Sequence, residues 1–253
     1  MGVVVRKLSL WVAVPALLSS LLVGCAGLPR EPWRGPAVPD SAWSPRLEDG
    51  TRVRVRPLPF GPERAAATLE YLRERSGDPE IASIALVPRM VVVHWTAIPT
   101  LEKTWEAFAP ELLPADRPEI ASAGRVNVSS QFLIDRDGTI YELLPETIVA
   151  RHTIGLNRVA IGIENVGGPE APLTDAQLRA NAALVMHLAQ KYPTIRYLIG
   201  HLEYTEWAGS SLWEERDPGY RTEKTDPGVD FLARLRARLA PLGLLAAEPR
   251  TDG

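Results

Sequence analysis

Two of the four histidines, His94 and His201, stand where a metal site could form. Each follows a short apolar run, Val91-Val92-Val93 before His94 and Leu198-Ile199-Gly200 before His201. Such runs are typical of buried strands, so both imidazoles should emerge at the strand ends, where open α/β sheets bind ligands. Two imidazoles and one carboxylate, with a fourth position open to water, make a catalytic zinc site. Histidines at strand ends more often serve purposes other than metal binding, so the zinc interpretation also requires a third ligand.

Asp226 is the candidate for that third ligand. It stands in the loop Lys224-Thr225-Asp226-Pro227-Gly228, just before a predicted helix. The same position would suit a helix N-cap, with Pro227 as the first helical residue. Capping would fix the rotamer of the carboxylate without excluding metal binding through its other oxygen. Both interpretations stay open at this point.

Glu164 is a charged residue in an otherwise apolar stretch that includes Ile161, Ile163 and Val166. The alternative is a surface carboxylate on an edge strand. Its apolar neighbours argue against that, because an unpaired buried charge is costly. A chemical role for Glu164 is therefore favoured. By contrast, His187 lies about 180° round a predicted helix from its apolar face and is expected to face solvent.

The elements that must position these residues alternate between strands and helices. The Asp137-Gly138 pair between two apolar runs predicts a hairpin, and Thr174-x-x-Gln177 predicts a capping box before a long helix. The pattern favours an α/β fold: a single domain, 51–245, with a central mixed β-sheet flanked by helices and the zinc site at the strand ends. The expected strands are 51–55, 90–93, 132–134, 140–143, 160–166 and 197–199, and the expected helices are 62–75, 101–108, a helix opening at Thr174, and 229–239.

The N-terminus predicts export. Arg6 and Lys7 precede an apolar stretch, Leu8–Gly24, which is typical of a secretory signal peptide over residues 1–24. The stretch ends in Leu22-Val23-Gly24-Cys25, which resembles a bacterial lipobox, so Cys25 is the expected lipidation site. Residues 25–50 would form a Pro-rich tether and 246–253 a C-terminal tail. The expected location is an exported lipoprotein at the outer membrane facing the periplasm, held by the lipid on Cys25.

Composition excludes some functions. The formal net charge is −3 and no basic stripe is present, so no nucleic-acid partner is expected. The chain has one cysteine, which excludes an intramolecular disulfide. A monomer is expected.

Taken together, six segments resemble the zinc-dependent N-acetylmuramoyl-L-alanine amidases, whose fold is shared with phage T7 lysozyme and the peptidoglycan recognition proteins. Single segments such as Gly-His are weak signals, whereas the six in family order are specific. They span roughly residues 88–240 and read Val-Val-Val-His94-Trp-Thr, Ser-Ser-Gln-Phe-Leu-Ile-Asp-Arg-Asp-Gly-Thr-Ile, Ala-Arg-His152, Ile-Gly-Ile-Glu164-Asn, Gly-His201 and Lys224-Thr-Asp226-Pro-Gly.

The resemblance implies an enzyme that hydrolyses the amide between the lactyl group of N-acetylmuramic acid and L-alanine, in peptidoglycan or its anhydro fragments. It implies Zn²⁺ as cofactor and a muropeptide as partner. Glu164 would be the acid/base and Lys224 would offset charge on the oxyanion. The implied zinc ligands are His94, His201 and Asp226, and the implied substrate contacts are His152, which could instead support the metal site, and Asn157.

One departure from the family concerns a tyrosine that some members carry just before the first strand of the hairpin. This chain has Val128-Ser129-Ser130-Gln131-Phe132 there, so the assisting role is absent or carried by other residues. The alternative function is a non-catalytic peptidoglycan-binding recognition protein on the same fold. Residues 209–221, which include Trp213 and Tyr220, are expected to form part of the cleft rim.

Overall fold

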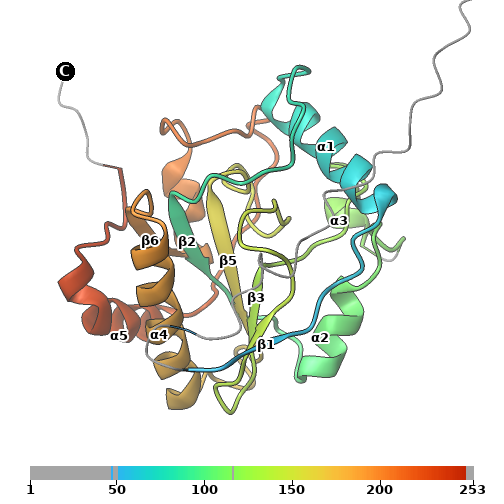
Figure 1. Cartoon of the computed structure of the whole chain (residues 1–253). Coiled ribbons are helices and arrows are strands. Elements are labelled where there is room, and N and C mark those ends of the chain that lie inside the picture. The colour runs from blue at the N-terminus through green and yellow to red at the C-terminus, as the bar shows by residue number, and fades with distance from the viewer. Residues whose placement is uncertain (1–46, 48–50, 116, 249–253) are drawn as a thin grey trace, which may run out of the picture. The chain divides into compact units, whose positions relative to one another are not determined.

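The computed structural model describes residues 47, 51–115 and 117–248 (Figure 1). The predicted signal peptide, Cys25, nearly all of the tether and the last five residues of the tail lie outside these residues. None of the helices in the described part of the chain is long and apolar enough to cross a membrane.

One six-stranded sheet organises the described residues, with strand order β1-β4-β3-β5-β2-β6. β3 and β4 pair antiparallel, and every other neighbouring pair is parallel. Gly138, with φ of 87°, supplies the backbone conformation that the β3–β4 turn needs. The mixed sheet predicted from sequence is thereby confirmed. Its strands are β1 Val53–Val55, β2 Met90–Val93, β3 Phe132–Ile134, β4 Ile140–Glu142, β5 Ala160–Asn165 and β6 Tyr197–Gly200.

The four predicted helices lie close to the predicted residues, whereas the short helix Pro118–Ala121 was not predicted. α4 opens with the predicted capping box: Thr174 Oγ1 accepts from the amide of Gln177 at 3.1 Å, and Gln177 Oε1 accepts from the amide of Thr174 at 2.9 Å. The helices are α1 Pro62–Ser76, α2 Leu101–Phe108, α3 Pro118–Ala121, α4 Asp175–Lys191 and α5 Val229–Leu239, with 3₁₀ turns η2 His201–Trp207 and η3 Ala240–Leu242.

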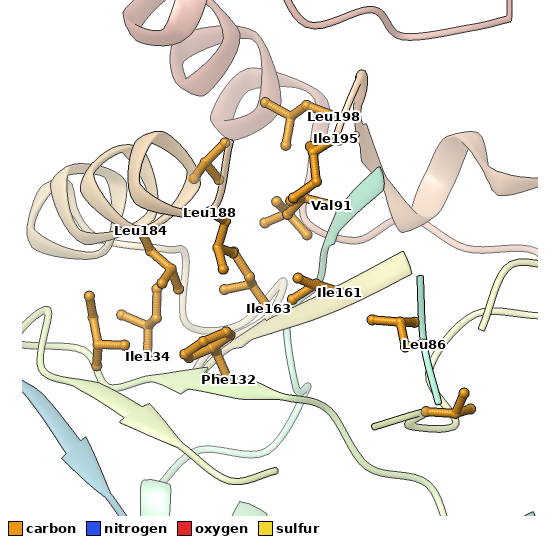
Figure 2. Close-up of a cluster of buried hydrophobic side chains, with 14 of the residues drawn as sticks. Leu86, Val91, Phe132, Ile134, Ile161, Ile163, Leu184, Leu188, Ile195 and Leu198 are labelled. Carbon is orange, nitrogen blue, oxygen red and sulfur yellow. The ribbon is translucent and has the colours of Figure 1, made fainter. Parts of the chain in front are cut away.

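One face of the sheet packs against α4 and α5. Figure 2 shows Leu184 and Leu188 of α4 above Phe132, Ile161 and Ile163 of the sheet, all of them fully buried. Burying each such side chain stabilises the fold by about 1.5–3 kcal/mol. This burial fixes which face of the sheet the helices cover. Because side chains alternate along a strand, the residues between them point to the other face.

The opposite face carries two smaller apolar clusters, one around Leu133 and Leu143 and one around Val92, Ile199 and Trp207. α2 packs into the first of these clusters through Leu101 and Phe108. His94, Glu164 and His201, at the carboxyl ends of β2, β5 and β6, belong to neither cluster. Polar side chains therefore occupy that part of the face.

His187 differs from its prediction. It is half-buried on α4, and its two ring nitrogens are enclosed without a hydrogen-bond partner among the described residues. Helical periodicity gave the right angle for His187 but could not show what packs over that side of the helix.

Candidate metal centre

Sheet register brings His94, Glu164 and His201 together. Val93 of β2 aligns with Ile163 of β5 and with Gly200 of β6. Each of the three polar residues follows one member of that row, and β2 lies between the other two strands. Aligned residues of neighbouring strands point to the same face at about 4.8 Å spacing. The three side chains therefore share the face opposite α4.

Asp226 joins the two histidines. Its Oδ2 lies 3.1 Å from His94 Nδ1 and 3.0 Å from His201 Nδ1, and the three ligand atoms all lie within 4.8 Å of one another. All three residues are buried. The N-cap interpretation of Asp226 is wrong, because the N-cap of α5 is Gly228 and the helix begins at Val229. The carboxylate is thus aimed at the histidines and not at the helix.

A chain of hydrogen bonds sets the ring tautomers. The Ala160 carbonyl can only accept, so His152 Nε2, at 3.2 Å, is the donor. In a neutral ring, His152 Nδ1 is then an acceptor, and it lies 2.8 Å from Thr153 Oγ1 and 3.1 Å from His94 Nε2. With a cation bound to its Nδ1, His94 would carry its hydrogen on Nε2, where His152 Nδ1 can accept it.

The loop that carries His152 is held by Asn157. Asn157 Oδ1 accepts from the backbone amides of His152 at 3.0 Å and Thr153 at 2.8 Å, while its Nδ2 donates to Tyr71 Oη at 2.9 Å. Gly162 of β5 makes room for the imidazole, since a Cβ there would lie 2.9 Å from the His152 ring. The hydrogen bonds of Asn157 to its loop and the close approach to Gly162 therefore hold the His152 imidazole in position.

Burial dominates the electrostatics of the histidines. It lowers the pKa of His201 to about 4, helped by the neighbouring charge of His94. It also holds the pKa of His152 well below its ordinary value, again with His94 as the second cause. For Asp226, burial opposes ionisation, but hydrogen bonds from His201 and His94 outweigh it, and the carboxyl pKa is below its usual range. Both shifts favour the neutral rings of His201 and His152, and the lowered pKa of Asp226 favours its carboxylate form, so His201 and Asp226 present electron-pair donors for a cation.

Glu164 is half-buried on β5, an internal strand, so the edge-strand explanation of this carboxylate is wrong. Burial raises its pKa to about 7, with a further rise from Asp226; His94 and Lys224 pull in the other direction. Its Oε2 is enclosed without a hydrogen-bond partner among the described residues. A carboxylate with a free oxygen and a pKa near neutrality can accept and return a proton.

These residues line one cleft of about 590 Å³. Its walls bring together the predicted His94, His201, Asp226, Glu164 and Lys224, as well as His152. Asn157 lines a smaller cavity of about 80 Å³ beside it. Of the expected rim segment, Tyr220 lines that smaller cavity, whereas Trp213 packs against Gly155 and beneath Arg221, 4.6 Å from its ring centre.

Sequence reasoning missed three contributors to this region: Thr153, Tyr71 and Arg151. Thr153 and Tyr71 act through hydrogen bonds to His152 and Asn157, and Arg151 lines both cavities. Tyr71 comes from α1, far away in sequence, and no local pattern links it to His152. Arg151 stands directly before His152, but only the fold shows that it is buried.

A mixed sheet that presents two histidines, a carboxylate and a separate glutamate with a raised pKa in one cleft is typical of metal-dependent hydrolases. A comparison with protein families narrows the class of hydrolase to which the chain belongs. The family model described as Amidase_2, N-acetylmuramoyl-L-alanine amidase, matches residues 85–229. The chain belongs to this family of enzymes.

The chain is also similar to individual proteins. The chain is 32% identical over 169 residues to the 1,6-anhydro-N-acetylmuramyl-L-alanine amidase AmpD of Citrobacter freundii, covering 61% of this chain and 82% of the relative. It is 31% identical over 105 residues to the endolysin of Klebsiella phage KP32, covering 37% of this chain and 69% of the relative. Among solved structures, that of a selenomethionine AmpD derivative aligns with 24% identity and a TM-score of 0.47, covering 79% of this chain and 97% of that one.

Proposed function

We propose that this chain is a zinc-dependent N-acetylmuramoyl-L-alanine amidase that cuts between the lactyl group of N-acetylmuramic acid and L-alanine, in peptidoglycan or its anhydro fragments. The observation that carries the proposal is the meeting of His94, His201, Asp226 and Glu164 in one cleft. The names of the AmpD relatives support the same bond and the same class of substrate.

The donor set fits zinc. Tetrahedral zinc with bonds of 2.0–2.1 Å holds neighbouring ligand atoms about 3.3 Å apart. Here Asp226 Oδ2 lies 3.1 Å from His94 Nδ1 and 3.0 Å from His201 Nδ1, close to that spacing, and all three atoms lie within 4.8 Å of one another. When bound there, zinc would acidify water and polarise the carbonyl of the scissile amide.

Glu164 is the proton carrier in this proposal. Its free Oε2 faces no internal donor among the described residues, so it can accept a proton from the attacking water. As the C–N bond breaks, the same carboxyl returns that proton to the nitrogen of L-alanine, which leaves as a neutral amine. The raised pKa suits both steps, because the proton is held neither too tightly nor too weakly.

Lys224 and His152 complete the proposed site. Lys224 lines the same cleft, and its ammonium would offset the negative charge that develops on the carbonyl oxygen. His152 also lines the cleft, and it orients His94 through their 3.1 Å contact. The polar atoms of Asn157 all bond within the protein, so we assign Asn157 to holding the His152 loop.

The N-terminal segment supports an exported lipoprotein anchored through Cys25, with the outer membrane as its site. Fatty-acid labelling of cells that express the chain should mark the wild type and not Cys25→Ser. Fractionation should find the labelled protein in the outer membrane. Label on the Cys25→Ser variant, or a soluble wild type, would contradict this part of the proposal.

The test of the activity is mass spectrometry of products from zinc-loaded protein incubated with sacculi and with anhydromuropeptides. Peptides that begin with L-alanine should be released, and EDTA, His94→Ala and Glu164→Ala should each abolish release. Glu170→Gln, an exposed carboxylate in the loop after β5, is the matched control and should keep activity. Binding to sacculi without release from either substrate would instead establish a non-catalytic recognition protein.

A further inference from the structure

The strap, residues 222–226, carries two residues of the proposed site, Lys224 and Asp226, and both line the cleft. Residues 222–225 belong to no helix or strand. No backbone–backbone hydrogen bond among the described residues involves Glu223 or Lys224. The position of Lys224 therefore depends on how the two ends of the strap are held.

The Asp226 end of the strap is held by the start of η2 and the end of β6. The amide of Leu202 donates to the Asp226 carbonyl at 2.8 Å. Pro227, the next residue, packs closely on Gly200, where a Cβ would lie 2.8 Å from Pro227 Cδ. These contacts hold Asp226 independently of the rest of the strap.

The Thr222 end is held by the side chain of Tyr204 in η2. Tyr204 Oη accepts from the Thr222 amide at 2.7 Å and donates to the Thr222 carbonyl at 2.8 Å. Only 1% of Tyr204 is exposed, and it belongs to the apolar cluster that includes Trp207. Its ring centre lies 5.3 Å from that of His201. The buried ring fixes the hydroxyl, and the hydroxyl binds both backbone groups of one strap residue.

We propose that Tyr204 is a positioning residue that holds Lys224 at the wall of the cleft; this inference rests on the proposed function. Thr222 lies two residues before Lys224, so a displacement of Thr222 reaches Lys224 directly. Packing alone does not account for the hydroxyl. A phenylalanine ring would fill the same place in the cluster without the cost of removing a phenol from water.

The two anchors separate the roles of the strap. Because Asp226 keeps its own contacts, loss of the Tyr204 hydroxyl should displace Lys224 and leave the metal ligands in place. Lys224 acts on charge that develops only in the transition state. Its displacement should therefore lower kcat and leave KM and zinc affinity unchanged.

The first test is Tyr204→Phe in the full-length zinc-loaded protein, assayed with muropeptides. Removing an oxyanion-stabilising group outright costs about 10²–10³ in kcat, so a displaced ammonium should cost about tenfold. The zinc dissociation constant, measured by chelator competition, should not change. Tyr197→Phe, whose ring packs on Trp207 at 4.7 Å, is the control and should keep kcat, KM and zinc affinity. Normal kcat in Tyr204→Phe would overturn the proposal, as would weakened zinc binding, which would place the effect on the metal ligands.

A double-mutant cycle tests whether Tyr204 acts through Lys224. In a Lys224→Met background, Tyr204→Phe should lower kcat by less than about twofold, because the group that the hydroxyl positions is already gone. The same loss of kcat in both backgrounds would mean that the hydroxyl acts by another route and would overturn the proposal.

Amide hydrogen exchange supplies a readout that does not depend on activity. The Thr222 amide should be protected in the wild type and exchange at least about tenfold faster in Tyr204→Phe, but not in Tyr197→Phe. An unprotected Thr222 amide in the wild type would overturn the proposal even if Tyr204→Phe does not fold. If the wild type cleaves no muropeptide, the proposed function fails, and the exchange rates still decide whether Tyr204 holds the strap.

Discussion

Nδ1 of His152 lies 3.1 Å from Nε2 of His94. This contact joins a loop residue to a candidate metal ligand, and the Ala160 carbonyl, 3.2 Å from the other nitrogen of His152, orients the contact. The strand carbonyl thereby leaves His152 Nδ1 able to accept the hydrogen that His94 Nε2 would carry when its Nδ1 binds a metal. Partners of this kind contribute substantially to metal affinity although they do not touch the ion.

Replacing His152 should therefore weaken zinc binding. His152→Phe keeps an aromatic ring over Gly162 but removes the acceptor for His94 Nε2. We expect the zinc dissociation constant to rise about 10–100-fold, measured by competition with a chromogenic chelator. His187→Leu, a histidine replacement away from the site, should leave zinc affinity unchanged. Unaltered affinity in His152→Phe would show that the contact does not orient His94.

The pH dependence of catalysis should report Glu164. The ionised carboxylate is the form that accepts a proton, and burial raises its pKa to about 7. A bound dication would favour ionisation, so kcat/KM should rise with pH along a limb whose midpoint is no higher than about 7. Glu164→Gln should lower kcat about 10²–10⁴-fold and keep zinc bound. A Glu164→Gln variant with near-normal kcat would assign the proton transfer to another group.

Metal-free protein should lose stability in acid because of His201. Burial holds its folded pKa at about 4, below its ordinary value of 6.5, so the unfolded chain binds the proton more readily. This contribution to stability is fully present above about pH 6.5 and is lost as the pH falls toward about 4. Urea unfolding in EDTA at stepwise pH would show the loss. His201→Gln should show a flatter dependence over that window, and identical curves would refute the assignment.

His187→Leu should stabilise the fold. The two ring nitrogens of His187 are enclosed without a partner among the described residues, and such groups typically cost about 1–3 kcal/mol. Removing them should raise the free energy of unfolding by about 1 kcal/mol, and Tm by about 2–4 °C for a chain of this size. His187→Asn keeps polar atoms in place and should not give the gain. A lower Tm in His187→Leu would mean that the ring has a partner in solution.

Local sequence signals predicted the elements that are determined by a few consecutive residues. The Asp137-Gly138 turn, the Thr174–Gln177 capping box and the apolar runs before His94 and His201 each depend on a few consecutive residues. Because these signals are local, the sequence alone placed both histidines at the ends of strands. The resemblance to a known family then assigned Asp226 to the metal and Glu164 to proton transfer.

Features that depend on tertiary packing could not be predicted from the sequence. Asp226 could be an N-cap or a ligand by sequence, and only the position of Gly228 at the start of α5 decided between them. The enclosure of His187 and of Arg151 depends on segments far away along the chain. The link from Asn157 to Tyr71 spans 86 positions in sequence, and no periodicity predicts it.

The alignment of Val93 with Ile163 and Gly200 also bears on how such a protein can vary. A residue inserted within β2 would move His94 along the strand by about 3.3 Å and turn it to the face covered by α4. A residue inserted in a connecting loop would move none of the three side chains. Homologous chains can thus differ greatly in loop length and keep the same chemistry, because what is inherited is strand pairing and not distance along the sequence.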